Sequence, residues 1–152
     1  MRLHVERHGS GRDLVLLHGW GLHGGVWSVL LERLAPGHRV HVIDLPGHGD
    51  SRRVPFASLD AAADAVAAEV PRGATVCGWS LGGLLALRIA TRHPLLAGAL
   101  ALVSTTPCFV ERPDWPHAMK AATLEAFATG LATDPAGMVG KFMEALTQKL
   151  RT

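Results

Sequence analysis

The sequence contains no tyrosine and only two cysteines among its 152 residues. Cys77 and Cys108 lie far apart, and neither has histidines, cysteines or acidic residues around it at the spacing of a metal site. We therefore expect no metal centre. Cys77 falls within an apolar run, and we interpret it as a small buried side chain of a strand.

Blocks of like charge and long apolar runs are also missing. The 15 Lys and Arg residues and the 13 Asp and Glu residues are scattered and leave a net charge of +2, with only four Trp and four Phe for base stacking, which argues against nucleic-acid binding. No apolar run is long enough to cross a membrane. The first ten residues carry Arg2, Glu6 and Arg7 where a secretory signal needs an apolar stretch. We expect a cytoplasmic protein without a membrane partner.

What the sequence does contain is a series of short runs rich in Val, Ile and Leu. Four of them lack polar alternation and are expected to form strands: residues 14–17, 40–43, 75–78 and 99–103. A strand that is apolar on both faces needs cover on both faces, which is typical of a parallel sheet with helices above and below. The sequence therefore predicts an α/β fold, with residues 4–7 as a short additional edge strand.

Helices are expected between these runs. The first covers residues 25–34 and places Trp27, Leu30, Leu31 and Leu34 on one side. The second follows Ser58, a good N-cap, and places Leu59, Ala63, Val66 and Val70 on one side. The third covers residues 81–92, is apolar nearly all round, and ends before a proline, so it is expected to be a central buried helix.

The character of the chain changes after residue 103, where Pro107, Pro113 and Pro116 interrupt it. Two amphipathic helices are expected beyond these prolines, and Asp134 with Pro135 is a typical start for the second. The apolar face of that helix comprises Met138, Val139, Phe142, Met143, Leu146 and Leu150. We interpret residues 1–104 as the N-terminal part of a core and residues 105–152 as the beginning of a helical lid.

The sharpest chemical signal is Gly78-Trp79-Ser80-Leu81-Gly82, between an expected strand and an expected helix. This is the context of the G-x-S-x-G nucleophile elbow, where a tight reversal strains the serine backbone and glycines prevent clashes. The following helix directs its N-terminal amides to the same place, so the Leu81 N–H can stabilise an oxyanion. The five-residue pattern also occurs by chance in Gly-rich loops, but the flanking elements favour Ser80 as a nucleophile.

A second signal, His18-Gly19-Trp20-Gly21, directly follows the first apolar run. This position supplies the other oxyanion amide in folds with such an elbow, and the Trp20 N–H is our candidate. His18 is an alternative for the catalytic base. However, the chain order in these folds is Ser, then acid, then His, and His18 precedes Ser80. We interpret His18 as a residue that braces the oxyanion loop by a hydrogen bond.

A third segment, residues 44–51, follows the 40–43 run and is rich in glycine. We interpret it as a tight turn. Phosphate binding is the functional alternative, but no lysine completes a P-loop there.

These motifs together carry a family resemblance. They are Leu16-Leu17-His18-Gly19-Trp20-Gly21, Asp44-Leu45-Pro46-Gly47-His48-Gly49, Gly78-Trp79-Ser80-Leu81-Gly82-Gly83, and Pro107-Cys108-Phe109 followed by Asp114-Trp115-Pro116. The chain resembles α/β-hydrolases, and within them the pimeloyl-acyl carrier protein methyl ester esterases of biotin synthesis. The resemblance implies a mostly parallel sheet with helices on both faces and an esterase without a cofactor.

The resemblance also implies roles for individual residues. Ser80 would attack the methyl ester of a pimeloyl chain on acyl carrier protein and release methanol, with Trp20 and Leu81 at the oxyanion site. Phe142, Met143 and Leu146 of the lid would line the acyl channel, although Glu144 departs from the family's more apolar pattern.

In that family the catalytic acid and histidine follow two further strands, and this sequence reaches Thr152 within the expected lid. Asp114 and His117 do not match the family positions. We therefore expect either a shortened version of the enzyme or one part of a unit completed elsewhere, with little esterase activity by itself. The 99–103 strand would then be an exposed apolar edge.

Other functions remain open because a fold and an elbow do not fix a substrate. The alternatives are another acyl hydrolase, a lyase, a cofactor-free peroxidase, or a binding protein without a working triad. Basic residues on or near the lid could meet an acidic carrier protein or could simply be solvated: Lys120, Lys141, Lys149 and Arg151.

Overall fold

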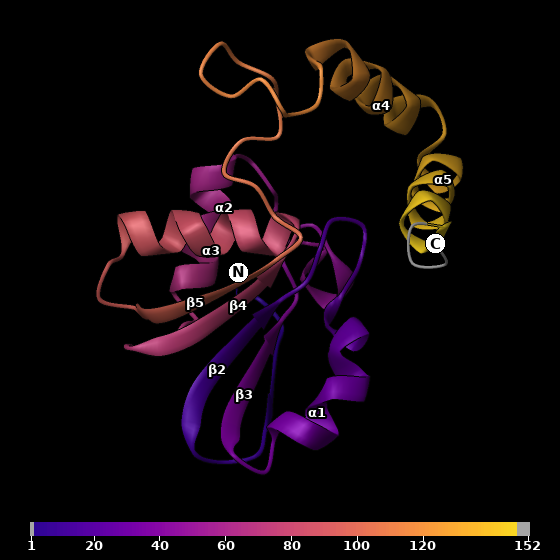
Figure 1. The fold of residues 1–152 in the computed structure, drawn as a ribbon. Helices are drawn as coiled ribbons and strands as arrows, with labels where there is room; N and C mark the ends of the chain where they lie inside the picture. The colour runs from indigo at the N-terminus through magenta and orange to yellow at the C-terminus, as the bar shows by residue number, and fades with distance from the viewer. Residues whose placement is uncertain (1, 149–152) are drawn as a thin grey trace. The chain divides into compact units, whose positions relative to one another are not determined.

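The computed structural model describes residues 2–148, with side chains described as far as Glu144. The chain divides into two compact units, Met1–Pro107 and Cys108–Thr152. The first unit contains a sheet with helices, and the second contains two helices (Figure 1).

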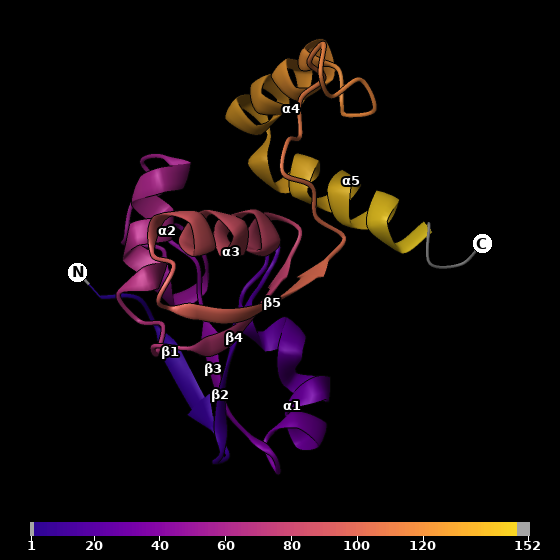
Figure 2. The same ribbon diagram turned by 60° about the vertical axis from the view of Figure 1, so that its left-hand side comes forward.

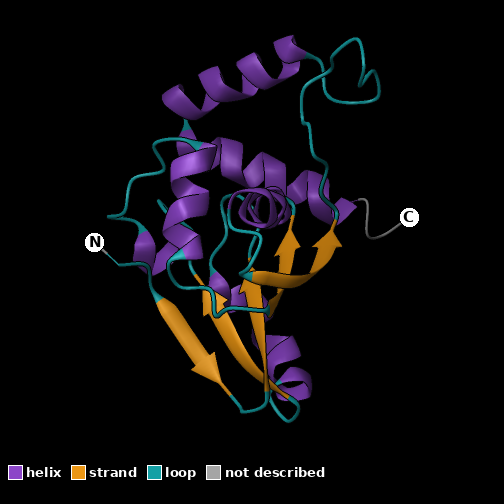
Figure 3. Ribbon diagram, turned by 90° about the vertical axis from the view of Figure 1, so that its left-hand side faces the viewer, coloured by secondary structure: helices purple, strands orange, loops and turns teal. Residues whose placement is uncertain are grey.

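The first unit is built on a five-stranded sheet with the order β1-β3-β2-β4-β5. The strands are β1 (Val5–His8), β2 (Arg12–Leu17), β3 (His38–Ile43), β4 (Ala74–Trp79) and β5 (Ala97–Val103). β1 pairs antiparallel with β3, and the other pairs are parallel (Figure 3). The predicted mostly parallel sheet with an added N-terminal edge strand is confirmed.

Helices cover both faces of this sheet. α2 (Leu59–Ala67) and α3 (Leu81–Arg92) lie on one face, and α1 (Ser28–Leu34) lies on the other (Figures 1 and 2). The predicted cap of α2 is present, because the Ser58 side chain accepts a hydrogen bond from the Ala61 N–H at 3.1 Å. α2 ends at Ala67, so the buried Val70 lies in the turn beyond the helix rather than on it.

The expected helix over residues 25–34 is only partly correct. Its first turn is a 3₁₀ helix, η1 (Gly24–Trp27), and only Ser28–Leu34 is α-helical. A 3₁₀ turn advances three residues per turn instead of 3.6, so it shifts which residues face the sheet. Trp27 is buried, but Leu30, expected on the same side, is 42% exposed.

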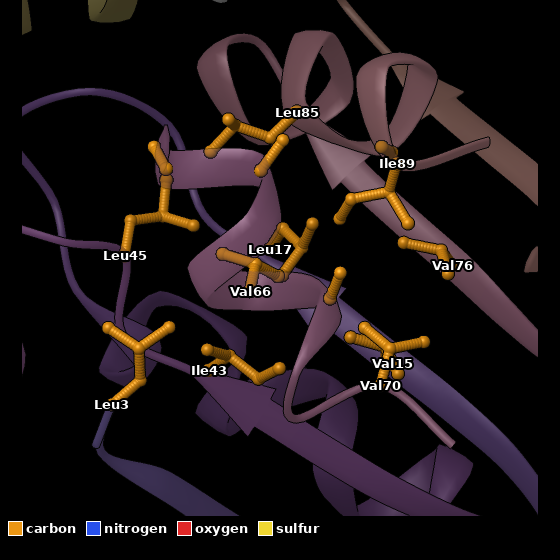
Figure 4. Packing of buried hydrophobic residues seen from close by; sticks show 14 of the residues in the cluster. Leu3, Val15, Leu17, Ile43, Leu45, Val66, Val70, Val76, Leu85 and Ile89 are labelled. Atoms are coloured by element: carbon orange, nitrogen blue, oxygen red, sulfur yellow. The ribbon is translucent and has the colours of Figure 1, made fainter. Parts of the chain in front are cut away.

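The core consists of two clusters, one on each face of the sheet. Alternate residues of β2 enter different clusters, with Val15 and Leu17 in one and Leu14 and Leu16 in the other. The larger cluster adds side chains of β3, β4, α2 and α3, among them Ile43, Val66, Val76, Leu85 and Ile89 (Figure 4). Because both faces are covered, the strands need no polar alternation.

β5 is an edge strand within the described sheet and pairs there with β4 alone. Leu102 and Val103 are 43% and 44% exposed. The exposed apolar edge expected for residues 99–103 is present.

The second unit comprises α4 (Ala121–Thr133) and α5 (Pro135–Gln148). The expected start of α5 is present, because the Asp134 carboxylate accepts a hydrogen bond from the Gly137 N–H at 3.0 Å. The rings of Phe127 on α4 and Phe142 on α5 pack with their centroids 6.1 Å apart. Over residues 2–148, none of the helices combines the length and the apolar character needed to span a membrane.

An ion-pair network links α2 to α3 and the residue after it. Arg88 and Arg92 contact Asp60, and Arg92 and His93 contact Asp64. The hydrogen bonds from Arg92 and His93 lower the pKa of Asp64 from its ordinary 3.8 to about 2. The carboxylate therefore stabilises the folded chain above about pH 4, and this contribution is lost as the pH falls toward 2.

We predict that Asp64→Asn lowers the urea midpoint at pH 7 and flattens its decline between pH 4 and pH 2. Asp114→Asn is the control, because Asp114 pairs with Arg112 on the surface of the other unit and is expected to leave both quantities unchanged. The prediction is wrong if Asp64→Asn shows the same acid-dependent decline as the unaltered chain.

Candidate functional site

The backbone reverses at Ser80, between the end of β4 and the start of α3. Its φ of 53° and ψ of −113° lie in a region that non-glycine residues rarely adopt. The Ser80 N–H donates to the Val103 carbonyl at 2.9 Å. The Ser80 carbonyl accepts from the Gly83 and Leu84 N–H groups and from the Thr105 hydroxyl. The sharp turn that the sequence pattern requires is therefore present.

Glycines let α3 approach the sheet closely at this turn. A Cβ atom at Gly78 would lie 2.3 Å from the Gly82 carbonyl oxygen, and one at Gly82 would lie 2.3 Å from the Leu17 carbonyl oxygen. Both contacts are with backbone, which cannot move aside. Only glycine fits at these two positions.

The loop after β2 lies beside Ser80. β2 and β4 pair in parallel, with Leu17 opposite Gly78, so the segments that follow them leave the same edge of the sheet. A Cβ atom at Gly19 would lie 3.6 Å from the Ser80 Cβ. The two residues whose amides we expect at an oxyanion, Trp20 and Leu81, line one pocket.

This pocket has a volume of about 590 Å³, within the range of small-molecule sites. Apart from Trp20 and Leu81, it is lined by Gly21, Leu22, Pro46, Gly47, His48, Gly49 and Phe56. No sequence pattern indicates Leu22 or Phe56 as pocket residues, because both reach the pocket from loops. His48 was identified only as part of the glycine-rich turn.

His18 is fully buried and bonds to two loops. Its Nε2 accepts from the Leu45 N–H at 3.0 Å, so Nδ1 carries the proton and donates to the Gly19 carbonyl at 2.8 Å. Burial, with a smaller contribution from neighbouring His48, lowers the pKa of His18 to about 4 against the opposing effect of the bond to Gly19. The bracing hydrogen bonds expected of His18 are present.

Asp44 organises the glycine-rich turn. Its carboxylate accepts from the Gly24 N–H at 2.6 Å and from the Asp50 N–H at 2.8 Å, and only 5% of the residue is exposed. Gly47 and Gly49 have φ values of 76° and 47°, so the predicted tight turn is present. Within the turn, the Asp50 N–H binds this carboxylate and the N–H groups of Gly47, His48 and Ser51 donate to backbone carbonyls, which disfavours phosphate binding.

One group of possible metal ligands lies within the described part of the chain. Ligand atoms of His4, Asp44 and Asp50 come within 4.8 Å of one another. His4 Nε2 lies 3.4 Å from a Glu6 oxygen, and both Asp44 oxygens accept backbone N–H groups. Hydrogen bonds within the protein therefore explain the arrangement without an ion.

Two histidines of the first unit are poorly placed to act on Ser80. Both ring nitrogens of His18 are engaged by backbone groups. His93 follows the 12-residue α3, so about 18 Å of helix separates it from Ser80, and it binds Asp64 at 2.7 Å.

His48 lines the pocket, with Nδ1 2.8 Å from the Pro46 carbonyl oxygen. Asp114 and His117 lie in the second unit.

The predicted acyl-channel residues also lie in the second unit. Phe142 and Met143 are on α5 and are half-buried. The side chain of Leu146 lies outside the described residues. The role of these three residues in binding substrate stays a prediction.

We predict that Asp44→Asn destabilises the fold by about 1–3 kcal/mol, because an amide can accept only one of the two N–H groups and turns a donor toward the other. Urea unfolding measures the change. Asp50→Asn is the matched control from the same turn, since its exposed side chain pairs with Arg52 at the surface. Equal losses in the two variants would contradict the role assigned to Asp44.

We predict that stability falls as the pH drops below 6.5, because the unfolded chain binds a proton that folded His18 refuses until about pH 4. Above pH 6.5 both states are neutral and the effect vanishes. The loss attributable to His18 between pH 7 and pH 5 is about 2 kcal/mol. Urea midpoints at the two pH values should differ less in His18→Gln than in the unaltered chain or in His8→Gln.

An NMR titration of the His18 ring in the unaltered chain provides an independent check. A pKa at or above 6.5 would contradict the prediction, whether or not the His18 variant folds.

Comparison with known proteins gives consistent matches to this architecture. The model of the alpha/beta hydrolase family matches residues 14–150. In a solved structure of an esterase from Exiguobacterium antarcticum, the match has a TM-score of 0.82 and 27% identity, and it covers 93% of this chain and 56% of that one.

Curated relatives are more similar in sequence. A pimeloyl-[acyl-carrier protein] methyl ester esterase of Nitrosomonas europaea is 45% identical over 141 residues, which cover 93% of this chain and 56% of the relative. The protein of the same name from Chromobacterium violaceum is 53% identical over 131 residues, which cover 86% and 52%. The chain thus spans about half the length of the curated relatives it matches. Because the family model matches most of its length, the chain belongs to the alpha/beta hydrolase family.

Proposed function

We propose that the chain carries the nucleophile and oxyanion part of a serine carboxylesterase that hydrolyses the methyl ester of pimeloyl-acyl carrier protein in biotin synthesis. The observation that carries the proposal is the strained turn at Ser80 beside a pocket lined by Trp20 and Leu81. The names of relatives that are 45% and 53% identical support the substrate.

The proposed reaction uses these groups. The Ser80 Oγ attacks the ester carbonyl carbon while a base takes its proton, and the N–H groups of Leu81 and Trp20 receive the negative charge on the carbonyl oxygen. The tetrahedral intermediate collapses, the methoxide takes the proton and methanol leaves. Water then hydrolyses the acyl-serine ester, which releases the carboxylate and restores the hydroxyl. This chemistry needs no cofactor.

We expect the base that takes the Ser80 proton to be neither His18 nor His93. His18 and His93 are both engaged elsewhere, and the chain order of the family places the acid and the histidine after the nucleophile. We therefore propose that the 152-residue polypeptide alone hydrolyses esters slowly. Loss of a triad member typically lowers the rate by a factor on the order of 10⁴–10⁶.

The substrate proposal extends to the second unit, which we interpret as the start of a lid. Phe142, Met143 and Leu146 would contact the acyl chain. Lys120 and Lys141 are exposed and could attract an acidic carrier protein, while Lys149 and Arg151 lie outside the described residues. A carrier-protein partner implies the cytoplasm as the compartment, and we propose that location.

The test compares the chain alone with the chain joined to the C-terminal half of the Chromobacterium violaceum relative. Release of methanol from pimeloyl-acyl carrier protein methyl ester is measured. We expect substantial turnover only in the joined protein. Ser80→Ala should lower it by a factor on the order of 10⁴–10⁶, because the nucleophile is gone.

Ser28→Ala, at the start of α1, is the control for the joined protein and should leave turnover unchanged. Turnover that survives Ser80→Ala would refute the nucleophile assignment. A joined protein that binds the ester but releases no methanol would favour a binding function instead.

A further inference from the structure

We propose that Thr105 is a positioning residue that holds Ser80 in its strained backbone conformation. Its hydroxyl donates to the Ser80 carbonyl with an Oγ1 to O distance of 2.7 Å. Thr105 belongs neither to β4 nor to α3, the two elements that form the turn, but to the loop that follows β5. The consequence for the reactivity of Ser80 rests on the proposed function, whereas the effect on its backbone does not.

The segment 103–105 binds both backbone polar groups of Ser80. The Ser80 N–H donates to the Val103 carbonyl at 2.9 Å, and the Ser80 carbonyl accepts from Thr105 two residues further on. The intervening Ser104 has a φ of 46°. Ser80 and Ser104 are the non-glycine residues with positive φ in the described part of the chain. The two strained residues therefore lie on the two segments that these hydrogen bonds join.

The packing around Thr105 explains a feature that the G-x-S-x-G pattern leaves open. The pattern ends at Gly82, yet the next residue is also glycine. A Cβ atom at Gly83 would lie 2.6 Å from both Cβ and Cγ2 of Thr105, and 2.8 Å from its hydroxyl oxygen. A glycine at 83 is therefore what lets the threonine reach the Ser80 carbonyl.

The hydroxyl can be removed without removing the turn of helix it contacts. The Ser80 carbonyl also accepts from the N–H groups of Gly83 and Leu84 at 3.0 and 3.1 Å, so α3 keeps its first hydrogen bonds without Thr105. The hydroxyl adds a hydrogen bond that links the Ser80 carbonyl to the loop after β5. Its loss should free the Ser80 peptide groups locally while the fold stays intact.

The experiment uses the full chain labelled with ¹⁵N. Thr105→Val keeps the shape and removes the hydroxyl, whereas Thr105→Ser keeps the hydroxyl. Thr91→Val is the matched control. The Thr91 hydroxyl also donates to a backbone carbonyl, that of Arg88 at 2.9 Å, but near the end of α3 away from Ser80. One readout is the hydrogen exchange rate of the Ser80 N–H in this chain. The other is the rate at which a fluorophosphonate probe labels Ser80 in the protein joined to the C-terminal half of the Chromobacterium violaceum relative, with the same substitutions.

We expect Thr105→Val to raise the exchange rate about tenfold and to lower the labelling rate by a similar factor, the size expected for one hydrogen bond. Thr105→Ser should restore both, and Thr91→Val should change neither. Unchanged exchange and labelling in Thr105→Val would overturn the proposal, as would an equal change in Thr105→Ser.

The two proposals fail separately. If Ser80 of the joined protein takes no label but the exchange of the Ser80 N–H in the chain still responds to Thr105→Val and recovers in Thr105→Ser, the positioning role holds and the failure belongs to the proposed esterase. If labelling occurs and the exchange of Ser80 ignores Thr105→Val, the positioning role is wrong and the esterase proposal stands.

Discussion

The strained backbone of Ser80 is the constraint on which the site depends. A residue in such a conformation costs about 1–3 kcal/mol and persists only where its surroundings hold it. Close packing at Gly78 and Gly82 surrounds it, the Ser80 N–H donates to Val103 at the end of β5, and the Ser80 carbonyl accepts from Thr105 in the loop beyond. The strain gives a serine that leaves a strand and enters a helix within one residue, as a nucleophile elbow requires.

The loops around the pocket beside Ser80 are held by two buried side chains, His18 and Asp44, that do not line the pocket themselves. His18 connects the loop after β2 to Leu45 after β3. Asp44 connects that same strand end to the start of η1 and to a second 3₁₀ helix, η2 (Gly49–Ser51). Trp20 and Phe56 line the pocket from loops and Leu81 lines it from the start of α3, and the buried His18 holds the loop that carries Trp20. Each of these bonds satisfies an amide or carbonyl that burial would otherwise leave unpaired, so the loops resist rearrangement.

The sequence was sufficient for features that depend on local pattern. The limits of α3 follow from Ser80 before it and Pro94 beyond it, and the parallel sheet follows from runs that are apolar on both faces. Leu30 was misplaced because the 3₁₀ turn before it breaks the helical period on which the expectation rested. Thr105 and Phe56 could not be found at all, since their positions depend on which loops meet in space. The hydrophobic periodicity of a sequence reports local helices and strands and carries no information about contacts between loops.

The two hydrogen bonds of the His18 ring allow it to hold the neighbouring loops but prevent it from accepting a proton from Ser80. An imidazole can take the proton of Ser80 only through a free lone pair, and the lone pair on Nε2 already accepts from the Leu45 N–H. Protonation would replace that acceptor by a donor facing a donor, in a site where burial already lowers the pKa to about 4. A base that works near neutral pH needs an accessible nitrogen and a pKa near the working pH. His18 is thus suited to holding the loop after β2, and in this bonded state it cannot accept the proton that the proposed reaction removes from Ser80.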